Sequence, residues 1–488
     1  MRILYIDINS LRPDHLGCYG YHRPTSPNID WLARQGVRFD NCYATDAPCL
    51  PSQAAFFSGR HGVSTGIVSH GGGPAAARTA EAGQGLPGPT PADSLTQHLR
   101  RAGCLTAMIS PFPGKDAASL FGKGFHETID TGRNGLERAH EVYPFVECWL
   151  RAHAKDSDWF LHVNLWDPHT PYDVPLQFGQ PFAHSPSPSW LTQAIIDRHR
   201  RSYGPHDAVT PCGHTKDFNW PRGAGTIRHP RDWKAWIDGY DTGIRHADHY
   251  VGEMIKELGR LGRLDETAIV VSADHGENQG ELEVYGDHQT ADQHTSHIPL
   301  IIRWPGLTDP LAGRSWPGLI YNIDLAATLA DLVTGRPADG WDGRSFAALL
   351  RGDDCPGREF LVLSQGAWSC QRSLRWKDWL LIRTHHTGNK NLPALMLFDL
   401  KSDPHETSNL ASIRPDLVGE GLRLMDQWLG QQLARSGATD PLAEIVATGG
   451  PCFARDQEVR RLTRVLRATG RPAHADWLEA NPGTPRMP

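Results

Sequence analysis

The chain has 488 residues, so we expect a large core with a smaller second domain rather than one small domain. Hydrophobic residues make up 39% and charged residues 21%, which excludes a disordered chain and favours a soluble globular one. The net charge of −6 is spread without runs. The sequence therefore offers no basic face for nucleic acid and no reason to expect a membrane as partner.

The N-terminal residues and the lack of a long apolar stretch predict a cytoplasmic location. Asp7 interrupts the apolar start MRILYIDIN too early for the core of a signal peptide. No later stretch approaches the ~18 apolar residues of a membrane span. The nine cysteines are irregularly spaced and form no C-x-x-C pair, so we expect neither a disulfide framework nor a zinc cluster.

Short apolar runs alternate with helical patterns through the first 350 residues. A helix starts at Ser26-Pro27 and stops at Gly36, and a second one follows Pro51. A long helical pattern covers 234–259, and strands are predicted at 2–8, 105–110, 158–165, 267–273 and 297–306. This alternation predicts an α/β fold with a large, mostly parallel mixed sheet and helices on both faces. Ligands of such sheets bind at the carboxyl ends of the strands.

The pattern changes near Arg358. FLVLSQ, WLLIRT and LMLFDL are short strands that predict a small antiparallel sheet, and the tail beyond Asp416 is helical. The segments 71–91 and 183–233 are expected to be loops, the second near the mouth of the site. We therefore predict a catalytic α/β domain at 1–350, a small C-terminal subdomain at 358–412 and a helical tail at 413–488.

The first polar cluster, Asp7, Asn9, Arg12 and Asp14, follows the first predicted strand. Positions 7 and 9 face the same way on a strand, so two oxygen-bearing side chains there suit a hard divalent cation. A strand-end turn capped by Asp or Asn is the ordinary alternative.

Two further clusters carry chemistry. Asp274-His275-Gly276-Glu277 follows the apolar strand TAIVVSA, where adjacent Asp and His suit metal ligation, although an Asp cap is the simpler reading. Cys49 stands just before the predicted helix SQAAFFSG, in positive potential that favours an anionic nucleophile and an anionic substrate. On composition alone, a buried structural cysteine in a loop is the better explanation of Cys49.

Together the clusters resemble one family. SLRPDHLGCYGYHRPTSPNIDWLARQGVRF, CLPS with GR six residues later, SADHGE, HIPLIIRWPG and LFDLKSDPHETSNLA occur in the order found in type I sulfatases. That family belongs to the alkaline phosphatase superfamily and includes arylsulfatases and enzymes like phosphonate monoester hydrolases. The resemblance runs from residue 1 to about residue 412.

The resemblance implies a hydrolase of sulfate esters, or of phosphonate or phosphate esters. The family binds one divalent cation, usually calcium, with Mn²⁺ or Mg²⁺ as alternatives. Its nucleophile is formylglycine (3-oxoalanine), made by oxidising the Cys of a Cys-x-Pro-Ser/Ala-x-Arg motif; the aldehyde hydrate attacks the ester and then expels sulfate. The expected partners are a small-molecule or saccharide ester substrate and a formylglycine-generating enzyme, and a homo-oligomer is compatible with the sequence.

Carried over by resemblance, Cys49 is the formylglycine precursor, and Asp274 and His275 are metal ligands. His169, in WDPHTPY, contacts the ester and protonates the leaving oxygen. The predicted catalytic set is Cys49, Gln53, His169 and His288, and the predicted metal ligands are Asp7, Asn9, Asp274 and His275.

Two motif positions depart from the family. Its first metal-binding Asp falls on Asn9 and the neighbouring acid on Ser10, so the site loses negative charge. Asp7 is a candidate to compensate, although two residues along a strand span ~6.6 Å. Gln53 replaces an Arg that helps the maturation enzyme recognise the motif, which puts conversion of Cys49 in question.

Two family lysines are also missing. Lys115 and Lys123 are candidates for the one in the family's Gly-Lys-Trp-His stretch, and His288 or His294 for the later one. These changes bear mainly on substrate identity.

Two rival hypotheses remain. A catalytically silent member of the family is favoured by Asn9 and Gln53, whereas Cys49, WDPHTPY and DHGE favour an enzyme. A two-metal phosphomonoesterase is the third hypothesis, but the additional Asp/His pairs expected for it are not found.

Overall fold

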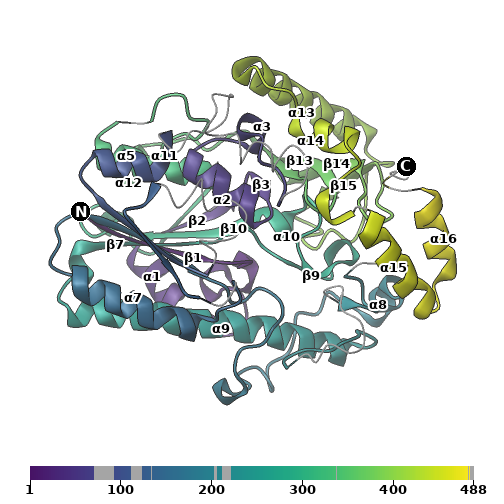
Figure 1. The fold of residues 1–488 in the computed structure, drawn as a ribbon, viewed down its shortest axis with the longest axis horizontal. Helices are drawn as coiled ribbons and strands as arrows, with labels where there is room; N and C mark the ends of the chain where they lie inside the picture. Colours follow the sequence, from purple (N-terminus) through teal and green to yellow (C-terminus); the bar gives the residue numbers. More distant parts are fainter. Residues whose placement is uncertain are drawn as a thin grey trace.

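The structure is a computed structural model that describes residues 1–70, 93–111, 124–132, 135–202, 206–211, 221–336, 338–454, 456–481 and 483. The predicted loop at 71–91 lies outside the described residues, as do Lys115 and Lys123. A large sheet crosses the middle of the molecule, and a smaller sheet stands beside it (Figure 1).

The large sheet has the strand order β11-β2-β10-β7-β1-β6-β4-β5. Its strands are β1 (Arg2–Ile8), β2 (Val37–Tyr43), β4 (Leu105–Ser110), β5 (Glu127–Asp130), β6 (Trp159–Leu165), β7 (Thr267–Ser272), β10 (His297–Arg303) and β11 (Arg314–Tyr321). The central strand β1 pairs in parallel with β6 and β7, whereas β10 runs antiparallel to β7 and β2. Positions 3–8 of β1 are all buried, which explains its continuous apolar sequence.

Helices cover both faces of this sheet (Figure 1). One face carries α2 (Cys49–Ser58), α5 (Leu95–Arg101), α11 (Asn322–Thr334) and α12 (Ala347–Leu350), and the other α1 (Pro27–Gln35), α7 (Ala139–His153) and α9 (Pro230–Arg260). Helix α1 ends before Gly36, where a Cβ would lie 2.2 Å from the carbonyl oxygen of Ile302, so glycine is required. The predicted mostly parallel α/β fold is confirmed.

The small sheet has the order β15-β14-β13-β12-β3. Its strands are β3 (Asp46–Ala47), β12 (Phe360–Gln365), β13 (Cys370–Trp376), β14 (Trp379–His386) and β15 (Leu395–Asp399). The four C-terminal strands are antiparallel, as predicted, while β3 joins β12 in parallel from the N-terminal part of the chain. Because β3 ties the two parts together, the three-part division of the chain stays a prediction.

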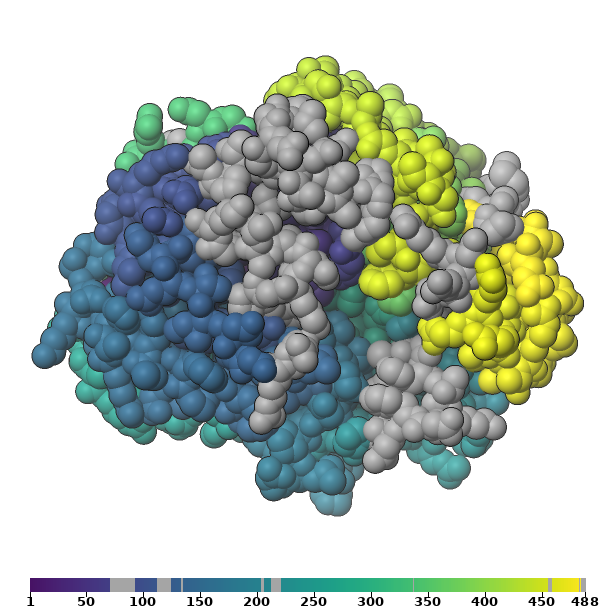
Figure 2. Space-filling view, viewed as in Figure 1, coloured from purple at the N-terminus to yellow at the C-terminus, as the bar shows by residue number. Residues whose placement is uncertain are grey.

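The tail is helical. Helix α13 (Pro415–Ser436) packs Met425 and Trp428 against Trp376 and Leu381 of the small sheet. Helices α14 (Pro441–Ala447), α15 (Asp456–Ala468) and α16 (Pro472–Ala480) follow, and the last two lie at one end of the molecule, yellow in Figure 2.

Short elements complete the fold: α3 (Gly62–Thr65), α8 (Gln193–His199), α10 (Gln293–Ser296) and the ribbon β8 (Asn278–Gln279) with β9 (Tyr285–Asp287). None of the described helices is both long and apolar enough to cross a membrane.

Candidate active site

The site forms where two neighbouring strands end. Asn9 follows β1 and Asp274 comes shortly after β7, and these strands pair in parallel with Asp7 opposite Ser272. Their carboxyl ends therefore lie at one edge of the sheet. Cys49 is the first residue of α2 and faces this edge, so the helix begins three residues earlier than its sequence pattern predicts.

Cys49 contacts the Asp-His pair directly. Its Sγ lies 3.1 Å from Nε2 of His275 and 3.8 Å from Nδ2 of Asn9. Nδ1 of His275 donates to the carbonyl oxygen of Gly276 at 2.7 Å, which turns Nε2 toward Cys49. Burial, with Asp274 adding to it, raises the pKa of the Cys49 thiol well above its usual range. The thiol is therefore protonated and donates to His275.

Asp274 is surrounded by donors. Its Oδ2 accepts from Nδ2 of Asn9 at 3.0 Å, and its Oδ1 accepts from the backbone N–H groups of Ser10 and His275. Burial raises the pKa of Asp274 to about 6, although His275 counteracts it. Asn9 thus contacts Asp274 through its amide nitrogen, while its Oδ1 accepts from Oγ of Ser10 at 3.1 Å.

Gln53 contacts Asp7. Nε2 of Gln53 donates to Oδ2 of Asp7 at 3.1 Å, and Nδ2 of Asn164 donates to the same oxygen at 3.3 Å. The other oxygen, Oδ1, is buried and accepts no hydrogen bond from any described residue. Asp7 therefore keeps one oxygen available beneath the site.

Two histidines stand opposite His275. The ring of His288 lies 4.1 Å from that of His275, and the ring of His169 lies 5.5 Å from that of His288. Nδ1 of His169 donates to the carbonyl oxygen of Thr170 at 2.7 Å, which leaves Nε2 with a lone pair. Surrounding protein, and then His275, lowers the pKa of His169 to about 3, so the ring is neutral.

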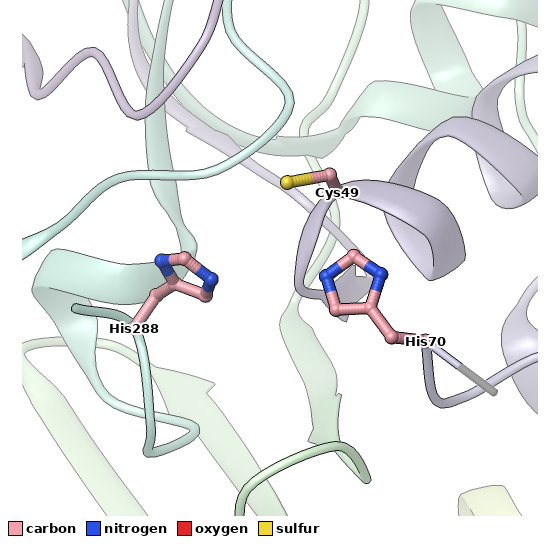
Figure 3. Close-up of side chains that lie close together, drawn as sticks. All are labelled: Cys49, His70 and His288. Atoms are coloured by element: carbon pink, nitrogen blue, oxygen red, sulfur yellow. The ribbon is translucent and has the colours of Figure 1, made fainter. Parts of the chain in front are cut away.

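His70 was not predicted. Cys49, His70 and His288 each offer one donor atom, and these atoms lie within 4.8 Å of one another. Figure 3 shows the three side chains facing a common space. His70 precedes a Gly-rich stretch and follows no predicted strand, so no sequence signal marks it.

Other predicted candidates lie elsewhere. Arg12 contacts Asp14 at 2.6 Å and Glu281 at 3.0 Å, in a buried cluster of its own. His294 belongs to that cluster: its Nε2 donates to the carbonyl oxygen of Pro404 and lies 3.7 Å from Glu281. Of the two histidines considered for the missing lysine, His288 is the one beside the Cys49 group.

A family model described as Sulfatase matches residues 2–335. The chain belongs to the sulfatase family. This membership places it among sulfuric ester hydrolases and their phosphonate- and phosphate-ester relatives.

Similar proteins agree with this family. An N-acetylgalactosamine-6-O-sulfatase of Bacteroides thetaiotaomicron is 25% identical, covering 87% of this chain and 92% of the relative. A choline-sulfatase of Rhizobium meliloti is 24% identical over 79% of this chain and 77% of its own. The solved phosphonate monoester hydrolase of Agrobacterium radiobacter superposes with a TM-score of 0.65 at 20% identity, covering 89% and 96% of the two chains.

A further solved structure, described as a complex with its substrate D-glucosamine-2-N,6-O-disulfate, has a TM-score of 0.71 at 18% identity. It covers 90% of this chain and 99% of its own. At these identities the solved structures establish the shared fold.

Sulfatases use a divalent cation, and several side chains of this pocket offer donor atoms for one. Cys49, Asp274 and His275 place one donor atom each within 4.8 Å, and Asp7 holds a free buried oxygen nearby. Calcium takes six to eight oxygen ligands, whereas this set mixes carboxylate, amide, imidazole and thiol. Because it offers oxygen, nitrogen and sulfur donors, the set differs from the all-oxygen ligand set that calcium prefers.

Proposed function

We propose that the protein hydrolyses sulfate esters, or phosphonate or phosphate esters of similar charge and shape, at the pocket around Cys49. The observation that carries the proposal is the approach of Cys49 Sγ to within 3.1 Å of His275 Nε2 at the first turn of α2. A nucleophile and a proton acceptor within this reach are the minimum that ester attack requires.

His275 serves as the proton acceptor for residue 49. Its Nδ1–H is fixed by the carbonyl oxygen of Gly276, so Nε2 faces the Cys49 side chain and plays this role while no cation occupies it. If Cys49 is converted to formylglycine, the hydrated aldehyde supplies the hydroxyl groups that attack and then release the ester's acid group.

The pocket suits an anion because α2 begins there. The backbone N–H groups of the first helical turn and the helix dipole favour negative charge beside Cys49. The surrounding imidazoles of His169, His288 and His70 have lowered pKa values, through burial first, and are neutral in its absence. An arriving anion raises these pKa values, so that His169 gains the proton it needs to protonate a leaving oxygen.

The wider assignments belong to the same proposal. A divalent cation held by Asp274 and His275, with Asn9 and Asp7, would neutralise the ester's charge and lower the nucleophile's pKa. The saccharide sulfatases among its relatives favour a sulfated saccharide as substrate. We also propose that a formylglycine-generating enzyme acts on Cys49 and that the protein is located in the cytoplasm.

A catalytically impaired protein is the second candidate. Gln53 holds Asp7 through a neutral hydrogen bond where the family has an arginine, and Nδ2 of Asn9 occupies Oδ2 of Asp274. Both contacts stabilise a pocket without a cation, so they favour a protein in which Cys49 stays a thiol.

Hydrolysis of three chromogenic esters tests the proposal: an aryl sulfate, an aryl phosphonate monoester and an aryl phosphodiester. We expect turnover of at least one by the wild-type protein co-expressed with a formylglycine-generating enzyme, and none by Cys49→Ala. Cys104→Ala is the matched control, because Cys104 is also buried but precedes β4. Equal turnover by Cys49→Ala would remove Cys49 from the reaction, and no turnover of any ester would favour the impaired protein.

A further inference from the structure

Cys49 faces a second pair of donors besides Asp274 and His275. His70 and His288 come from separate loops, after α3 and after β9, and each aims a ring nitrogen at the space next to Cys49 Sγ (Figure 3). These two donors share only Cys49 with the Asp274 pair.

The position of His288 is fixed by its backbone. Its N–H donates to Oδ1 of Asp287 at 2.7 Å, and its carbonyl oxygen accepts from Nε2 of Gln365 on β12 at 2.6 Å. Nδ1 of His288 is buried and has no hydrogen bond within the described residues, although Oδ1 of Asp287 lies 3.4 Å away. A buried imidazole nitrogen without a hydrogen bond is a group with unused ligand capacity.

We propose that the chain whose Cys49 remains a thiol binds a zinc-type cation through Cys49 Sγ and one ring nitrogen each of His70 and His288. One thiolate and two imidazoles are ligands that Zn²⁺ prefers and that calcium does not. Zinc sites are four-coordinate, so three protein ligands leave one position open toward the pocket.

Binding is coupled to loss of the thiol proton. The Cys49 proton passes to solvent, and the positive charge of the ion takes its place beside the sulfur. The two imidazoles bind as neutral rings and release no proton. The affinity should therefore increase with pH, with about one proton released per ion.

The proposed site exists only in the chain with an unconverted Cys49 thiol, which ester hydrolysis does not use. An aldehyde at position 49 has no thiolate to offer, so conversion to formylglycine removes the site. Metal binding by the thiol form is therefore independent of whether the converted chain hydrolyses esters.

Cobalt(II) is the probe, because a thiolate ligand gives it a sulfur-to-metal charge-transfer band in the near ultraviolet. Full-length protein is produced without a formylglycine-generating enzyme, and the thiol at Cys49 is verified by peptide mass. We expect saturable cobalt binding with this band, displaced by Zn²⁺ and unaffected by excess Ca²⁺. His70→Gln and His288→Gln should each weaken binding by at least about tenfold, since losing a ligand costs no less than losing its supporting contacts.

Two further variants separate the sites. His184→Gln is the control, because His184 is exposed and should leave the affinity unchanged. His294→Gln should also leave it within about threefold, because His294 belongs to a separate donor set with Glu281 and His405. A charge-transfer band that persists in Cys49→Ser, or an unchanged affinity in both His70→Gln and His288→Gln, would overturn the inference.

Discussion

Asn9 contacts the proposed metal ligand Asp274 through its amide nitrogen. It stands where the family has an aspartate, and it donates to Asp274 where a carboxylate would be repelled unless a cation lay between the two. The hydrogen bond therefore stabilises the pocket in the form without a cation, while it lowers the negative charge available to bind one.

We predict that Asn9→Asp increases affinity for Mn²⁺ by about tenfold or more, because a second carboxylate joins Asp274. Isothermal titration of both proteins measures this. Unchanged or weaker Mn²⁺ binding would show that residue 9 is not a ligand.

We propose that Gln53 lowers the extent to which Cys49 matures to formylglycine. An arginine at this position restores the family motif and replaces the neutral hydrogen bond to Asp7 with a charge-assisted one. We predict that Gln53→Arg, co-expressed with a formylglycine-generating enzyme, raises the fraction of the Cys49 peptide that carries the aldehyde. Mass spectrometry of that peptide decides it, with Gln53→Lys as the control that adds charge without the guanidinium fork. An equal aldehyde fraction in wild type would show that Gln53 is simply tolerated.

Sequence motifs brought together Asn9, Cys49, Asp274 and His275, because each follows a strand or opens a helix at the same sheet edge. His70 was not predicted, because its loop has no periodic pattern and its place beside Cys49 depends on long-range packing. The expectation that the cysteines form no zinc cluster stays a prediction; it relied on spacing along the chain, which does not register ligands brought together by folding.

At the scale of elements, the buried apolar strands were the most predictable. Strand β13 was missed because its sequence, CQRSLRW, is polar although it is fully buried. Arg372 in β13 forms two hydrogen bonds with Asp440, which begins α14, and Gln371 accepts from the backbone of Ala291. The hydrogen-bond partners of these polar side chains lie far away in the sequence, so no local pattern predicts that the strand is buried.

His61, which precedes α3, ties that helix to α13. Its ring lies edge-on between Tyr321 and Trp428, with ring centroids 4.9 and 5.1 Å away. Burial lowers the pKa of His61 to about 4, although Asp342 opposes this. In the unfolded chain His61 takes up a proton near pH 6.5, whereas in the folded chain it stays neutral until about pH 4. The folded chain therefore has its full stability above about pH 6.5, and the free energy of unfolding decreases as the pH falls toward 4.

We therefore predict that His61→Phe, which cannot titrate, changes the pH dependence of unfolding. Between about pH 7.5 and pH 5, the free energy of unfolding of wild type should fall by roughly 2 kcal/mol relative to the variant. Urea denaturation at the two pH values measures the difference, and the exposed His184→Phe is the control. A wild-type-to-variant difference that does not change with pH would contradict the buried, neutral state of His61.

At the scale of the whole molecule, two sheets meet at the site. The large sheet supplies Asn9 and Asp274, while the small sheet holds the His288 loop through Gln365 and pairs with β3 just before Cys49. The two layers were predictable from strand and helix patterns, but their joining through β3 was not, because a two-residue strand carries no periodic signal.

The central claim is that residue 49 is the reacting group of an ester hydrolase, and the most direct test is turnover measured against its chemical state. Preparations of wild type and Gln53→Arg with different aldehyde fractions, determined by mass spectrometry of the Cys49 peptide, are assayed with the aryl ester that turns over fastest. Turnover should be proportional to the aldehyde fraction and vanish in Cys49→Ala. Turnover that is independent of the aldehyde fraction, or that survives Cys49→Ala, would contradict the account.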